Sequence, residues 1–148
     1  MTNHSAMIPL QIAAIKSNLP AYTLAWQINH VFQMDLALSL DWQKITPSNE
    51  ISHHLHYFCN FEDVELNWHL ISNKGSKSFF LKTKPNFDYF FICSGEDLFS
   101  YFNRALEDLK KAPKVEHIFD FDLSIIKNPD FIYQNIKKNK EFKNDLHV

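Results

Sequence analysis

Three histidines are the strongest candidates for a chemical role in this chain. His54 and His56 alternate along one predicted strand, and His69 lies on the following one. With residues 60–63 as the hairpin turn, His54 lies directly opposite His69, and His56 lies diagonally from it on the same face. Opposite Cβ atoms in such a ladder are about 5 Å apart and diagonal ones about 7 Å. The sequence therefore predicts three imidazole groups close together.

Two interpretations of this histidine face remain open. Three imidazoles could hold a zinc ion with water as the fourth ligand, as in catalytic zinc sites. Alternatively, His54, His56 and His69 form a solvated or helix-covered polar face without a chemical role, since a chain with 8 histidines contains such spacings by chance. No acidic general base is clearly placed beside them. We therefore favour the second interpretation and predict neither a bound metal nor a cofactor.

Asp88 is the second candidate, because it is a lone carboxylate in an otherwise apolar run, FDYFFIC at residues 87–93. A run that is apolar on both faces predicts a central strand covered on both sides. A carboxylate buried there must be hydrogen-bonded, paired, or have a raised pKa. Asp88 could then be a general acid–base group or a structural carboxylate that accepts backbone N–H groups. We favour the structural role because no histidine or cysteine partner is recognisable beside it.

Trp26 is the third residue of interest, on a helix predicted over residues 20–33. Apolar residues recur there at three- and four-residue spacing and form one stripe, and Trp26 lies at its edge beside Ala25. Aromatic residues at such an edge more often belong to the core, which we expect here. The alternative is an exposed anchor for a partner, since tryptophan is enriched at interface hot spots.

The elements that position these residues alternate between period-two and helical patterns. They predict an α+β fold with a largely antiparallel sheet of about six to seven strands and two helices, in the order β-α-β-β-β-β-β-α-β. The predicted strands are at residues 7–15, 36–40, 51–59, 64–70, 77–84, 87–93 and 115–121, and the predicted helices are at 20–33 and 95–111.

The clearest pairing is the hairpin that carries the histidines. Its predicted register places Leu55 opposite Trp68 and Tyr57 opposite Leu66, so that the apolar side chains of both strands face the core. A one-residue slip would put these side chains on opposite sides of the sheet. A second turn, at residues 73–76, predicts another hairpin with Leu70 opposite Phe79.

Composition bounds the class of protein. The chain has 148 residues, 45% hydrophobic and 22% charged, which is typical of one globular domain with an ordered core over about 8–133 and a polar, Lys-rich tail at 134–148. With only Gly75 and Gly95, it has no Gly-rich phosphate loop. A formal net charge of −2 gives no field to attract nucleic acid, and we expect none to bind, even at the lysines of residues 137–140.

Two further features indicate a cytoplasmic protein. No run approaches the ~18 apolar residues of a membrane span, and residues 1–8 lack the pattern of a secretory signal, so we expect no membrane partner. Cys59 and Cys93 lie in separate apolar runs and predict two buried thiols in a reducing compartment.

Three stretches together resemble the IPExxxVDY family, a small group of uncharacterised Bacteroidetes proteins. AYTLAWQIN at residues 21–29 is similar to the family's helix, ISNK at 71–74 to a hairpin, and LKTKPNFDY at 81–89 stands in the place of the naming motif. Of that motif only Asp88 and Tyr89 are retained, and Thr83 replaces its glutamate. The resemblance covers about residues 10–133 and implies a small cytoplasmic protein, without implying an activity.

No motif in the chain specifies a reaction. We expect a non-enzymatic binding or protein-interaction domain, homodimeric through an edge strand or an aromatic-rich face, because aromatic residues make up 15% of the chain. The acidic residues of the last strand, Glu116, Asp120 and Asp122, are expected to be its solvated side. The alternative is a small metal-dependent or general acid–base enzyme that uses the histidine face or Asp88.

Overall fold

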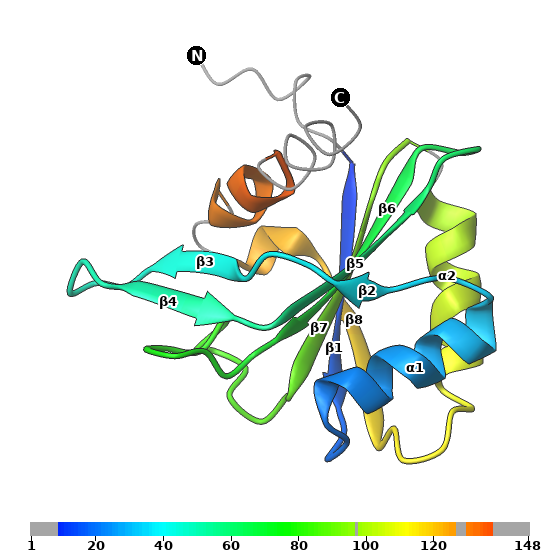
Figure 1. Cartoon of the computed structure of the whole chain (residues 1–148), viewed down its shortest axis with the longest axis horizontal. Helices are drawn as coiled ribbons and strands as arrows, with labels where there is room; N and C mark the ends of the chain where they lie inside the picture. The colour runs from blue at the N-terminus through cyan, green and yellow to red at the C-terminus, as the bar shows by residue number, and fades with distance from the viewer. Residues whose placement is uncertain (1–8, 97, 127–129, 138–148) are drawn as a thin grey trace.

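The predicted α+β class is confirmed by a computed structural model that describes residues 9–96, 98–126 and 130–137 (Figure 1). A short 3₁₀ turn, η2 (Leu123–Ile125), and a helical segment at 130–137 follow the last strand. The other elements, in chain order, are β1 (Leu10–Lys16), α1 (Ala21–Phe32), β2 (Ala37–Leu38), β3 (Trp42–Ile45), β4 (Ile51–His54), β5 (His56–Phe61), β6 (Leu66–Ser72), β7 (Tyr89–Ser94), α2 (Leu98–Leu109) and β8 (His117–Phe121).

Six strands form one antiparallel sheet in the order β2-β5-β6-β7-β1-β8, and β3 and β4 form a separate two-stranded sheet. β7 lies inside the larger sheet and all six of its residues are buried. The prediction of a central strand covered on both faces is therefore confirmed for residues 89–94. The physical reason is that a strand with apolar side chains on both faces is stable only between two packed layers.

Each face of the large sheet has its own core. Helices α1 and α2 cover one face, where Trp68 and Phe91 pack against Phe102 of α2 (Figure 1). On the other face, Trp42 of β3 and the 73–88 loop pack together with the helical segment 130–137. Ile136 is 3% exposed in this second core. The packed part of the chain thus extends beyond residue 133, where the sequence predicted a polar tail.

The hairpin of β5 and β6 has the predicted faces but a different register. Its turn is at 62–65, and the ladder pairs Cys59 with Trp68, Tyr57 with Leu70 and Phe61 with Leu66. The predicted and observed registers differ by an even number of residues, so each side chain stays on its predicted side of the sheet. The observed register adds a contact between the Phe61 and Trp68 rings, with centroids 5.6 Å apart.

Two predictions about this region are wrong. Leu55 lies between β4 and β5 and is 41% exposed rather than facing the core. The second hairpin does not form either, because β6 pairs directly with β7 and places Leu70 opposite Phe91. Only an isolated bridge, Lys74 to Phe79, remains of it among the described residues. The intervening loop instead inserts the fully buried Phe80 into the second core.

Candidate functional site

The predicted histidine face is a cluster inside the second core, which we call the histidine cluster (His54, His56 and His69). His56 of β5 and His69 of β6 are diagonal neighbours, with His56 Nε2 2.9 Å from His69 Nδ1. His54 is not opposite His69 as predicted. It belongs to β4, where it pairs with Trp42, and its Nδ1 lies 3.0 Å from the carbonyl oxygen of Ser72.

The hydrogen bonds fix the tautomer of each ring. His56 Nδ1 lies 3.0 Å from the carbonyl oxygen of Leu40, which can only accept, so Nδ1 carries the proton and Nε2 accepts. His69 Nδ1 must then be the donor to His56, and His69 Nε2 is left with a lone pair. By the same reasoning His54 donates from Nδ1 to Ser72. The Nε2 atoms of His54 and His69 are buried and have no hydrogen-bond partner among the described residues.

Burial keeps the cluster neutral. His54, His56 and His69 are 0%, 2% and 0% exposed. Burial lowers the pKa of His56 to about 4, against the opposing effect of its bond to Leu40. Burial also lowers the pKa of His54, and it holds the pKa of His69 well below its ordinary value, with a smaller contribution from nearby His56.

The walls of the cluster are aromatic. The indole of Trp42 meets both His56 and His69 edge-on, at centroid distances of 5.1 and 5.3 Å. Phe58 packs on the ring of His69, and Phe80 on that of His54. Within the described part of the chain, no three His, Cys, Asp or Glu side chains are placed to hold a metal ion. The cluster is therefore a buried polar part of the second core, enclosed by aromatic side chains.

A small hollow lies beside the cluster and was not foreseen. It has a volume of about 230 Å³, and His56 forms part of its wall together with Trp42 and Asn135. At its border, His53 Nδ1 lies 3.8 Å from Asp41 Oδ2, and both side chains are about half exposed. Neither residue stood out in the sequence, because the β3–β4 hairpin was not predicted and the packing of Asn135 on Gln43 joins segments 92 residues apart.

Asp88 is not in the central strand. It is exposed and directly precedes β7, which corrects the prediction of a buried carboxylate. Its Oδ2 accepts the backbone N–H of Ser17 at 2.9 Å, and its own N–H donates to the carbonyl oxygen of Ile15 at 2.9 Å. Asp88 thus ties the end of β1 to the start of β7.

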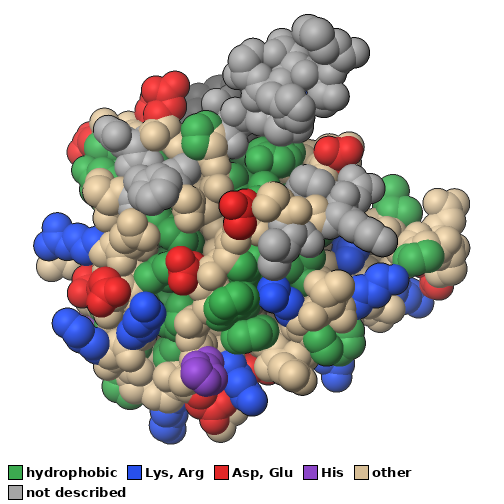
Figure 2. Space-filling view, turned by 180° about the vertical axis from the view of Figure 1, so that it is seen from behind, with side chains coloured by type: hydrophobic (Ala, Val, Ile, Leu, Met, Phe, Trp, Pro, Cys, Tyr) green, Lys and Arg blue, Asp and Glu red, His purple; other side chains and the backbone are tan. Residues whose placement is uncertain are grey.

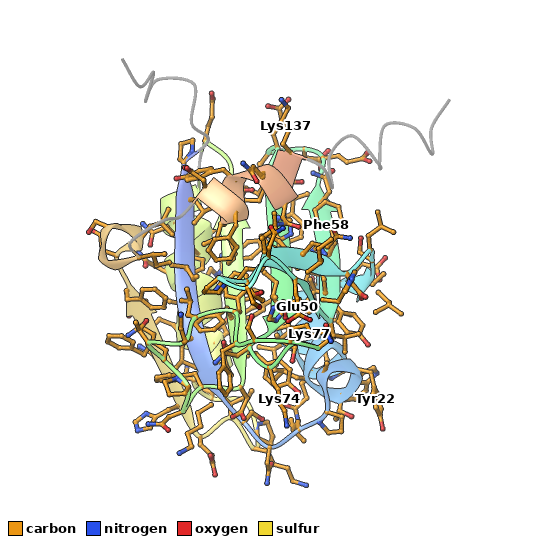
Figure 3. All side chains as sticks on the ribbon, turned by 90° about the vertical axis from the view of Figure 1, so that its left-hand side faces the viewer. Tyr22, Glu50, Phe58, Lys74, Lys77 and Lys137 are labelled. Atoms are coloured by element: carbon orange, nitrogen blue, oxygen red, sulfur yellow. The ribbon has the colours of Figure 1, made fainter. Side chains whose placement is uncertain are left out.

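Trp26 lies outside the core, contrary to our expectation. It is 64% exposed, and its ring stacks on His30 with centroids 5.4 Å apart and an interplanar angle of 7°. Tyr22, one turn earlier on α1, is 68% exposed and labelled on the outer side of the helix in Figure 3. The apolar stripe of α1 that does face the core consists of Ala21, Leu24, Ala25 and Ile28.

The open edge of the sheet carries a second exposed aromatic group. Phe119 of β8 is 46% exposed and stacks with Phe87 and Phe121 at 6.3 and 5.9 Å. The ammonium of Lys84 lies over the rings of Phe119 and Phe121, at 4.8 and 4.9 Å from their centroids. Hydrophobic side chains are visible among charged ones in the view from behind (Figure 2). Glu116, Asp120 and Asp122 are exposed.

Comparison with known proteins does not identify the chain. No family model matches it, and no curated protein matches it. The resemblance to the IPExxxVDY family therefore stays a prediction. No helix of the described residues is long and apolar enough to cross a membrane. Of the lysine run at 137–140, only the exposed Lys137 lies within the described residues.

Proposed function

We propose that this protein is a non-enzymatic interaction protein that forms a homodimer through the edge of β8. The observation that carries the proposal is the asymmetry of the sheet edges. β2 is only two residues long, whereas β8 has five residues and no further strand beside it in the described part of the chain. A long unpaired edge is a template for pairing with another strand.

The hydrogen bonds of β1 indicate which backbone N–H and C=O groups of β8 are free to pair with a second copy of the strand. The N–H of Gly95 donates to the carbonyl oxygen of Pro9, so the odd-numbered residues of β1 bond to β7. Backbone groups alternate in direction along a strand, and the even-numbered residues of β1 therefore bond to β8. Their partners there include Phe119. The N–H and C=O groups of Ile118 and Asp120 consequently point away from the sheet.

This alternation leaves a small set of registers for two antiparallel copies of β8. A register centred on Phe119 pairs all five strand residues and sets Ile118 opposite Asp120 of the second copy. The two Phe119 side chains then form a pair without hydrogen bonds, with Cα atoms about 4.5 Å apart. A register centred on Ile118 sets Glu116 against Asp120, and one centred on Asp120 sets that residue against itself. Like charges directly opposite destabilise a ladder. The Phe119-centred register is favoured because it pairs all five residues of β8 and sets no like charges opposite each other within the strand.

Acidic residues just outside β8 make the proposed dimer sensitive to salt. In the favoured register Glu116 lies opposite Asp122 of the second copy, although the Asp122 carboxylate is turned back to accept the N–H of Ser124 at 2.9 Å. Repulsion between exposed carboxylates is screened by ions, over a length of about 10 Å at 0.1 M. The dimer is expected to tighten as salt is raised.

Light scattering at micromolar concentration tests the proposal with a matched pair of variants. Asp120→Pro removes an outward N–H, and proline is tolerated where the N–H of an edge strand faces solvent. Asp120→Asn removes the same charge and keeps the N–H. We expect the wild type and Asp120→Asn to have the mass of two 17.5 kDa chains and Asp120→Pro the mass of one. A wild type that stays monomeric at all salt concentrations refutes the proposal.

The family resemblance and a cytoplasmic location belong to this proposal as well. The location is supported by Cys59 and Cys93, which are both buried thiols. Burial raises the pKa of the Cys93 thiol well above its ordinary value, which fits a structural cysteine without redox function.

A second candidate function is favoured by the hollow beside the histidine cluster. The pair His53 and Asp41 at its border could act in acid–base chemistry on a small polar ligand, since an imidazole beside a carboxylate can accept and return a proton. Screening small polar metabolites for a thermal shift that Asp41→Asn abolishes would support this alternative. The absence of any such shift would leave the interaction proposal alone.

A further inference from the structure

A groove on the second core has the composition of a ligand site. Its volume is about 700 Å³, within the range of roughly 300–1,000 Å³ that is typical of sites for small molecules. It lies between β3, the loop at 81–83 and the helical segment 130–137. Its walls combine apolar side chains, among them Ile45, Leu81 and Phe131, with two lysines, Lys44 and Lys82.

Lys44, which lines this groove, is held in place by hydrogen bonds. Its Nζ donates to the carbonyl oxygens of Phe80 at 2.8 Å and Phe79 at 3.3 Å, and lies 5.1 Å from the centroid of the Phe131 ring. An ammonium group has three protons, so one remains for a further acceptor. These contacts fix the direction of the side chain before any ligand arrives.

Neither lysine of the groove, Lys44 or Lys82, is ion-paired within the described residues. Asp130 lines the groove but is not ion-paired with either lysine. Burial, and secondly the nearby charge of Lys82, lower the pKa of Lys44. An anion placed beside the two lysines would pair with them directly.

We infer that this groove binds a small amphipathic organic anion, with its carboxylate at Lys44 and Lys82 and its apolar body against Ile45, Leu81 and Phe131. A charged hydrogen bond from Lys44 would orient the carboxylate. The apolar walls favour a ligand with a hydrocarbon chain or ring over an inorganic anion. This site is separate from the edge of β8 and does not depend on dimer formation.

Calorimetry with octanoate, octan-1-ol and inorganic phosphate at pH 7.5 tests the inference on the full chain. We expect octanoate to bind at least tenfold more tightly than octan-1-ol or phosphate. Lys44→Met should weaken octanoate binding about tenfold and Lys82→Met several-fold, because each variant removes one charged contact with the carboxylate. Lys44→Arg keeps the charge and should retain most of the binding. The matched control is Lys77→Met, because Lys77 does not line the groove and is ion-paired with Glu50 at 3.4 Å (both are labelled in Figure 3). It should have no effect.

Octan-1-ol distinguishes a lost charge from a lost groove. If Lys44→Met binds octan-1-ol as the wild type does while losing octanoate, the lysine recognises the carboxylate. Equal affinity of the wild type for octanoate and octan-1-ol would overturn the inference. So would phosphate binding as tightly as octanoate, Lys44→Met retaining full octanoate affinity, or no octanoate binding at millimolar concentration.

Discussion

Replacing His56 with glutamine should remove part of the pH dependence of stability. Burial lowers the pKa of folded His56 to about 4, whereas an unfolded histidine titrates near its ordinary 6.5. Between these values the unfolded chain binds the proton and the folded chain does not, so stability falls as the pH is lowered from 6.5 towards 4. Each unit of difference between the unfolded and folded pKa values corresponds to about 1.4 kcal/mol of stability. His56 alone therefore lowers the free energy of unfolding by roughly 3 kcal/mol between pH 6.5 and pH 4.

The surroundings of His56 offer nothing that would compensate an added proton. The neighbouring titratable groups that lower the pKa values of the histidine cluster are all basic: Lys44 and His53 act on His54, and His56 acts on His69. No carboxylate contributes to the lowered pKa values of these three rings. A proton on His56 Nε2 would also face the donor Nδ1 of His69, at 2.9 Å.

Urea unfolding at pH 7.5 and pH 5.0 measures this effect. Between pH 7.5 and pH 5.0, we expect the free energy of unfolding of the wild type to fall by about 2 kcal/mol more than that of His56→Gln. This is the part of the His56 contribution that is lost within this pH interval. His56→Gln should also be less stable at pH 7.5, because the bonds to Leu40 and His69 are altered. The control is His53→Gln, since His53 is about half exposed on the neighbouring strand. Equal pH dependence of the wild type and His56→Gln would refute the reasoning.

Three further predictions concern stability. Trp68→Ala should cost about 3–5 kcal/mol in chemical unfolding, because the indole is 1% exposed in the first core; a loss below about 1 kcal/mol would contradict the packing. Gly75→Ala should cost about 1–3 kcal/mol, because the new Cβ would lie 2.4 Å from Cε1 of the buried His54. An unchanged melting temperature would show instead that the loop around Gly75 can shift without loss of stability. Asp88→Ala should lose about 1 kcal/mol through the Ser17 N–H, while Asp88→Asn keeps an acceptor and most of the stability; equal losses in both would argue against this bond.

The sequence alone determined the class of the fold and the side of the sheet on which most strand residues lie. Side chains alternate with a period of two, so the pattern of β6 assigned Trp68 to one face and His69 to the other whatever the register. The unbroken apolar run of β7 likewise indicated a strand covered on both faces. Because side chains alternate with a period of two, the predicted register of the β5–β6 hairpin could be wrong by an even number of residues and still place His56 and His69 on the same face.

Tertiary structure decided what the local pattern leaves open. Whether Trp26 is covered depends on how α1 meets the sheet. Whether the histidine cluster is solvated depends on Trp42 of β3 and on Asn135, which comes from a distant part of the chain. The grouping of Lys44 with Lys82 likewise joins residues far apart in sequence. Periodicity reports the two sides of one element, but which neighbour covers each side is set by contacts between elements, and those contacts leave no period in the sequence.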